Sequence, residues 1–143
     1  MIDLKVALSF LAVTLMVVGY IPYLRDTIKG VTKPHVFSWI IGMCVSFIAF
    51  GLQIQEKSGP ASLVTLCAAL ISAVVVYYAF KNTDKDITLI DYACLLFSFA
   101  SLVAWLLVKQ PVLSMLFVVL TETIGFIPTI RKSWKRPDTE TLS

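Results

Sequence analysis

The sequence predicts an all-α membrane protein with five transmembrane helices: a bundle of three, a linker helix, and the start of a second, parallel bundle. The first observation behind this prediction is composition. Of the 143 residues 58% are hydrophobic and 15% charged, and the mean hydropathy is +0.86. A globule of this size cannot bury so much apolar surface, so most of it must face lipid or another chain. The second observation is a series of long apolar runs, and the third is an internal repeat.

Four uncharged runs are each near the ~20 residues that cross ~30 Å of hydrocarbon. They are residues 6–24, 36–55, 58–80 and 92–108. A fifth run, 110–130, has the same length but contains Glu122, which insertion tolerates when the carboxyl is protonated or partnered. Every span must be helical, because lipid cannot satisfy the backbone groups of an open strand edge.

Basic residues are distributed unevenly between the two ends of these spans. Nine follow spans one, three and five, whereas Lys5, Lys57 and Lys109 lie at the opposite ends. Because cytoplasmic segments carry the excess of Lys and Arg, we expect an integral, multi-pass protein with its N-terminus outside and its C-terminus cytoplasmic.

Several function classes are excluded at this stage. The net charge of +3 is broken up by apolar runs, and nucleic-acid binding needs a contiguous basic face. The three cysteines lie within apolar runs and form no C-x-x-C pair, and His35 has no metal-ligand spacing around it. We therefore expect no nucleic acid, metal or cofactor. We also expect no enzyme, because Glu122 has no second carboxylate, or His and nucleophile, within the spans.

The repeat appears at an offset of 106 residues. Gly, Ile, Pro, Arg and Lys are identical between Gly19-Tyr20-Ile21-Pro22-Tyr23-Leu24-Arg25, continuing to Lys29, and Gly125-Phe126-Ile127-Pro128-Thr129-Ile130-Arg131, continuing to Lys135. With one residue removed, Ser38 aligns with Ser143. Both copies end a helix that enters from outside and lead into a basic segment, so the repeats are parallel.

This repeat divides the chain into three parts. Residues 1–81 form the first triple-helix bundle, 82–109 the linker helix, and 110–143 the first helix and basic loop of a second, incomplete repeat. By comparison with the first repeat, we expect the second to have two further spans. We expect the sequence to be a truncated form of a seven-span protein; the alternative is that another chain, such as a second copy in a homo-oligomer, completes the bundle.

Each repeat contains a proline near the end of its helix. Proline has no N–H to donate four residues back, so Pro22 and Pro128 each weaken the helix locally. Gly19 and Gly125, three residues earlier, add backbone freedom and permit close helix approach. We predict that these four residues form a paired hinge for a cytoplasmic gate; the alternative is a static kink that ends each helix.

The run Pro22-Tyr23-Leu24-Arg25, followed by Lys29, Thr32 and Ser38, together with its second copy from Pro128 to Ser143, resembles the PQ-loop family, which includes the SWEET and SemiSWEET sugar transporters. The resemblance covers spans one to three and the start of the second repeat. It implies alternating access between triple-helix bundles, with the motif prolines as hinges and the solute between the bundles.

Two features depart from the family pattern. Tyr23 and Thr129 stand where the motif has glutamine. Sugar-transporting members also have a tryptophan late in the second helix and an asparagine in the third, whereas this chain has Phe50 in the former region and no Asn in the third span. Phe50 and Gln53 could replace the stacking and hydrogen bonding of those residues only in part.

Glu122 is the one acidic residue deep within a predicted span. It lies nine residues before Arg131, which is about 13 Å along a helix. A charge at that depth costs about 3 kcal/mol or more, so we expect Glu122 to be protonated, paired across the bundle, or turned toward a wet cavity. A structural hydrogen bond and a proton-coupled or solute-binding carboxyl are both open. Met16 holds the equivalent position in span one, so the acid breaks the repeat symmetry.

Three further features have simple structural interpretations. Thr88 and Asp91 have the spacing of a helix capping box. Small residues around Ser98 form a stripe on span four that is typical of helix packing. The aromatic residues near span ends are typical of interfacial belts: Tyr20, Tyr23, Trp39, Tyr77, Tyr78 and Trp105.

The function that we expect is a transporter-like membrane protein that moves a small polar solute by alternating access. The alternative is a non-transporting membrane subunit or receptor that uses the same helical unit for partner contacts. The candidate hinge residues are Gly19, Pro22, Gly125 and Pro128, and the candidate substrate or proton residues are Glu122, Gln53 and Phe50.

Overall fold

A computed structural model describes residues 4–81, 87–108 and 111–140, and all regular structure in these ranges is helical. The long helices are α1 (Leu4–Ile28), α2 (Val36–Gln55), α3 (Ser62–Lys81), α4 (Leu89–Leu107) and α5 (Pro111–Lys135). Two 3-10 turns, η1 (Gly59–Ala61) and η2 (Pro137–Thr139), accompany them. The predicted all-α class and its five helices are confirmed.

Within these ranges, α1 to α4 are long and apolar enough to cross a membrane. They indicate a multi-pass membrane protein, as composition predicts. Helix α5 has 25 residues and is not one of these four. Its crossing of the membrane stays a prediction.

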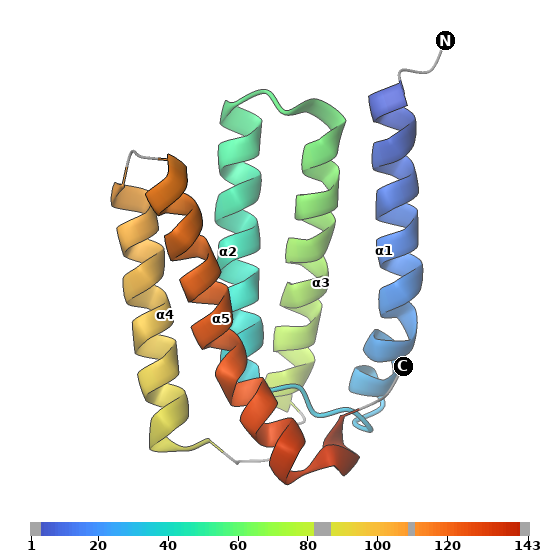
Figure 1. The fold of residues 1–143 in the computed structure, drawn as a ribbon. Helices are drawn as coiled ribbons and strands as arrows, with labels where there is room; N and C mark the ends of the chain where they lie inside the picture. Colours follow the sequence, from blue (N-terminus) through green and yellow to red (C-terminus); the bar gives the residue numbers. More distant parts are fainter. Residues whose placement is uncertain (1–3, 82–86, 109–110, 141–143) are drawn as a thin grey trace.

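The helices do not pack in the order of the sequence. Helix α3 lies between α1 and α2, while α5 packs along α4 and leans across α2 (Figure 1). The chain thus forms a group of three helices, α1–α3–α2, and a pair, α4–α5, which are joined through α2. The arrangement as two parallel repeats stays a prediction, because residues 141–143, including the Ser143 of the sequence alignment, lie outside the described ranges.

The buried core is small and is centred on α2. One cluster contains Val36, Phe37 and Ala79, and a second contains Ile41, Val45 and Leu102. Many other large apolar side chains are exposed, including Leu96 and Leu107 on α4. This distribution suits a protein whose apolar surface is covered by lipid.

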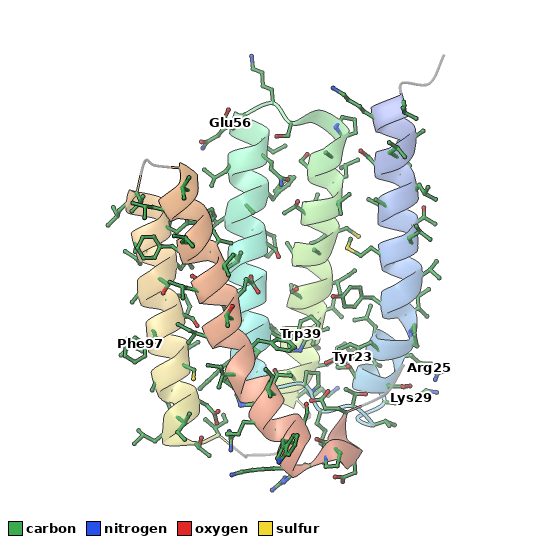
Figure 2. The ribbon with its side chains drawn as sticks, viewed as in Figure 1. Tyr23, Arg25, Lys29, Trp39, Glu56 and Phe97 are labelled. Atoms are coloured by element: carbon green, nitrogen blue, oxygen red, sulfur yellow. The ribbon has the colours of Figure 1, made fainter. Side chains whose placement is uncertain are left out.

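Both proline-containing helices are longer than the sequence predicts. Helix α1 continues past Pro22 to Ile28, and α5 continues past Pro128 to Lys135. The alternative in which these prolines end their helices is therefore wrong. A helix can lose one backbone hydrogen bond and continue when its neighbours hold it in place. The two basic ends lie at the same end of the structure, opposite Glu56 (Figure 2).

Helix α4 begins as the sequence predicts. The Thr88 backbone N–H donates to Asp91 Oδ2 at 2.7 Å, and the Thr88 hydroxyl lies 2.9 Å from the same oxygen. Within the stripe of small residues on α4, Cys94 and Ser98 are buried, and the Ser98 hydroxyl donates to the Thr121 carbonyl of α5 at 3.2 Å, whereas Ala93 and Ala100 are exposed. The capping box is confirmed, and the packing interpretation holds only for the buried part of the stripe.

Candidate functional site

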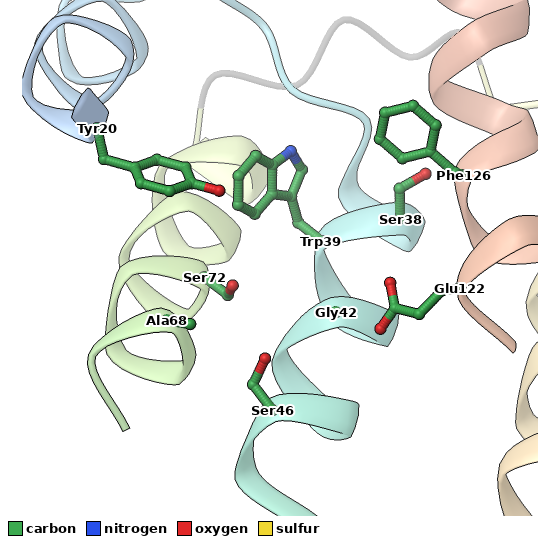
Figure 3. A pocket seen from close by; sticks show the side chains of 9 residues that line it. All are labelled: Tyr20, Ser38, Trp39, Gly42, Ser46, Ala68, Ser72, Glu122 and Phe126. Carbon is green, nitrogen blue, oxygen red and sulfur yellow. The ribbon is translucent and has the colours of Figure 1, made fainter. Parts of the chain in front are cut away.

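A cavity of about 250 Å³ lies between α1, α2, α3 and α5. Tyr20 comes from the last turns of α1, and Ser38 from the first turn of α2, so this part of the lining lies toward the basic end, where Figure 2 shows Trp39 near Arg25 and Lys29. Figure 3 shows the lining side chains. At about 30 Å³ for each water molecule, this space corresponds to roughly eight waters.

Small and hydroxyl-bearing residues keep the cavity open and polar. Ser38 and Ser46 line it from α2, and Ser72 from α3. Gly42 of α2 and Ala68 of α3 present no bulk, and a Cβ added at Gly42 would meet nothing within 4 Å. The described lining therefore offers three serine hydroxyls on the side formed by α2 and α3.

Aromatic rings from three helices line the same space. Tyr20, Trp39 and Phe126 come from α1, α2 and α5. The Trp39 ring packs edge-on against Tyr20, with centroids 6.4 Å apart, and stacks on Tyr23 at 5.4 Å and 30°. The stacked pair lies on the basic-end side of the cavity.

The rings of Tyr20 and Tyr23 on α1 both contact Trp39 of α2. Tyr20 is 36% exposed, so the interfacial-belt interpretation of these residues stays a prediction. Tyr77, which is 63% exposed, still fits a lipid-facing position. One sequence signal pointed to the cavity: Tyr20 and Phe126 are equivalent in the repeat, and both line it.

Glu122 of α5 faces the cavity. Its side chain reaches toward Gly42 of α2, on the same side as Phe126 of α5 and across from Tyr20 and Ser72 (Figure 3). Among the residues that the structure describes, no hydrogen bond, ion pair or nearby charge accompanies its carboxyl group. Glu122 was predicted to be protonated, paired across the bundle, or turned toward a cavity. In the described structure it lines a cavity and has no partner across the bundle.

Phe50 and Gln53 lie elsewhere. Both are half-buried on α2, and neither lines the cavity. Gln53 is seven residues beyond Ser46, which is about 10 Å along the helix. The structure therefore does not bring these two candidates together with Glu122.

The four candidate hinge residues have unequal surroundings. A Cβ added at Gly125 would lie 2.9 Å from Ile41 Cδ1 and 3.0 Å from Ile41 Cγ2, whereas one at Gly19 would meet nothing within 4 Å. Pro128 is fully buried, whereas Pro22 is only partly buried. Gly125 thus permits α5 to approach α2 closely, and its repeat counterpart on α1 has no such contact.

A cluster of buried charges lies at the basic end of α4 and α5, and sequence reasoning missed it. Asp91 is fully buried and accepts two hydrogen bonds from Arg131, from Nε to Oδ1 at 3.1 Å and from Nη2 to Oδ2 at 2.6 Å. Arg25, the repeat counterpart of Arg131, instead pairs with its neighbour Asp26 and is 62% exposed. The spacing in the sequence revealed the cap at Asp91, but not this ion pair across 40 residues.

His35 joins the same cluster from the segment before α2. Its Nε2 lies 3.6 Å from Asp91 Oδ2, and the ring is 4% exposed. Burial lowers the pKa of His35, and the positive charges of Lys132 and Arg131 lower it further, although Asp91 opposes them. A neutral imidazole is therefore favoured at this position.

Contacts of the C-terminal segment connect the two basic loops. Lys132 Nζ lies 3.8 Å from Glu140 Oε1, and the Lys33 backbone N–H donates to the Thr139 carbonyl at 2.9 Å. The segment after α1 and the segment after α5 are thereby held together at the end of the bundle where Trp39 lies.

The described residues include no group of three His, Cys, Asp or Glu side chains placed to hold a metal ion. No protein-family model, curated protein or solved structure matches the chain. The function is therefore inferred from the residues that line the cavity and from the contacts at the basic end of the bundle.

Proposed function

We propose that this protein is a membrane transporter that moves a small polar solute by alternating access, with the cavity as its solute site. One observation carries the proposal: the cavity lies between the α1–α3–α2 group and α5, and its walls include the repeat-equivalent residues Tyr20 and Phe126. A solute site between two helical units that move relative to each other is a common transporter design.

In this proposal all five helices cross the membrane, and the basic end is cytoplasmic. The nine-to-three distribution of basic residues supports that orientation. The packing of α5 along α4 and α2 supports its crossing, because an apolar helix that packs beside spanning helices shares their environment. The fold is of the PQ-loop kind, with the second repeat represented by α5.

The cytoplasmic gate consists of two layers. The inner layer is the Tyr23–Trp39 stack. The outer layer is the backbone hydrogen bond from Lys33 to Thr139, which ties the two basic segments together. Opening requires the last turns of α1 and α5 to separate, and Pro22 and Pro128 stand where those turns join the rest of each helix.

Solute uptake into proteoliposomes tests this proposal. The panel contains sugars, amino acids, amines and small acids, and protein-free liposomes give the background. We expect saturable uptake of at least one class. The Pro22→Ala, Pro128→Ala double variant should insert normally and transport several-fold more slowly, because restored backbone hydrogen bonds stiffen the gate. The absence of uptake across the whole panel by folded protein would contradict the proposal.

A further inference from the structure

The cavity also indicates the chemical class of the solute. We propose that it binds a small organic cation, with the Glu122 carboxylate as the counter-charge and the rings of Tyr20, Trp39 and Phe126 around the cationic group. This inference rests on the proposed function for its transport role, whereas the binding itself can be measured without transport.

The first argument is electrostatic. Glu122 faces the cavity without an ion-pair partner among the described residues. The nearest basic residue along α5 is Arg131, about 13 Å farther along the helix axis, and its guanidinium is engaged by Asp91. Glu122 is an exposed residue that also lines the cavity. Within the membrane that we propose around α5, its carboxylate needs a compensating charge, and a cationic ligand would supply it.

The second argument is the aromatic lining. A cation over an aromatic face is attracted by the ring quadrupole, most strongly by tryptophan. Three aromatic side chains from three different helices line the space that Glu122 faces, and Trp39 is one of them. Rings and a carboxylate around one small volume are the usual environment for an ammonium group.

The cavity lining also lacks the side chains that a neutral polyol would need. Sugar hydroxyls are best held by side chains that both donate and accept in pairs, such as amides. Among the lining residues no Asn or Gln is present, and Gln53 lies outside the cavity. The serine hydroxyls of Ser38, Ser46 and Ser72 suit a ligand with one or two polar substituents. A volume of about 250 Å³ suits a small ligand.

Calorimetric binding to the purified full chain in nanodiscs tests the inference. Choline is the probe, and 3,3-dimethylbutan-1-ol, which has the same shape without the charge, is its neutral control. We expect choline to bind at least tenfold more tightly than the alcohol. Ethanolamine, which carries N–H groups in place of the methyl groups, should bind as a cation too, and its rank against choline identifies the preferred head group.

Two substitutions locate the site. Glu122→Gln keeps the shape of the side chain and should weaken choline binding at least tenfold while leaving the neutral alcohol unchanged. Glu56→Gln is the matched control, because Glu56 is an exposed carboxyl at the far end of α2, and it should leave both affinities unchanged (Figure 2). Phe126→Leu should weaken choline several-fold through loss of one ring.

The outcomes separate this inference from the proposed function. Equal affinity for choline and the neutral alcohol, no binding of either cation by folded protein, or a Glu122→Gln variant with unchanged choline affinity would overturn the cation site. Uptake of neutral solutes without cation binding would likewise overturn it and leave the transporter proposal standing. Choline binding that depends on Glu122, without flux of any solute, would support the site and remove the transport function.

Discussion

The contact between Gly125 and Ile41 predicts that two equivalent glycines respond oppositely to the same substitution. Alanine at position 125 would place its Cβ 2.9 Å from Ile41 Cδ1 and 3.3 Å from Ile41 Cβ. Overpacking of this kind costs about 1–3 kcal/mol, and alanine recovers about 0.5–1 kcal/mol of helix propensity. Gly125→Ala should therefore lower the free energy of unfolding by roughly 0–2.5 kcal/mol.

Gly19→Ala is the control for this prediction. A Cβ there meets nothing within 4 Å, so only the propensity gain of about 0.5–1 kcal/mol remains, and the variant should be slightly more stable than the parent. Unfolding by SDS in mixed micelles, followed by circular dichroism, measures both variants. Ile41 is a core residue, so Ile41→Ala is destabilising by itself, but Gly125→Ala should cost less on that background than in the parent, because the two nearest contacting methyl groups are gone.

Two results would refute this reasoning. Equal stability of the two single alanine variants would mean that the close approach of α5 to α2 does not set the role of Gly125. A double-mutant cycle without coupling between positions 41 and 125 would show that their side chains do not meet as described.

The remaining predictions concern charge. Arg131→Gln leaves Asp91 buried without its partner and should lower the free energy of unfolding by about 3–5 kcal/mol. Arg25→Gln, which breaks an exposed pair, should lower it by under about 1 kcal/mol. Equal stabilities of the two variants in SDS unfolding would contradict the buried pair. Burial lowers the pKa of His35 in the folded protein, so the unfolded chain binds a proton at His35 more tightly. The free energy of unfolding should therefore fall as the pH drops below about 6.5. His35→Gln should reduce that loss. The orientation can be tested with single cysteines at positions 33 and 57 in a chain whose native cysteines are replaced. An impermeant thiol reagent should label the two positions from opposite sides of the membrane. Labelling of position 33 but not 57 from outside would reverse the proposed orientation.

The sequence was most informative where a pattern is local. Apolar run lengths predicted the helices, and the spacing of Thr88 and Asp91 predicted the start of α4. The apolar runs already passed Pro22 and Pro128, but the extension of α1 to Ile28 and of α5 to Lys135 was not predictable from hydropathy, because those last turns are polar.

The candidate site depended on packing that hydropathy does not contain. Trp39 near a span end suits an interfacial belt, and only the structure shows that its ring contacts Tyr20 and Tyr23 and lines the cavity. The Asp91–Arg131 pair needs α4 to pack along α5. Glu122 could be identified from the sequence because a carboxyl in an apolar run is rare. It lines the cavity, which agrees with one of the environments predicted for it.

Access to the cavity from the two sides of the membrane tests the central claim most directly. Ser46→Cys, in a chain whose native cysteines are replaced, places one thiol in the cavity wall. The account predicts that an impermeant thiol reagent labels this position from either side, and that the Pro22→Ala, Pro128→Ala double variant slows labelling from the basic side several-fold. Labelling from one side only, at a rate that the proline substitutions leave unchanged, would contradict alternating access.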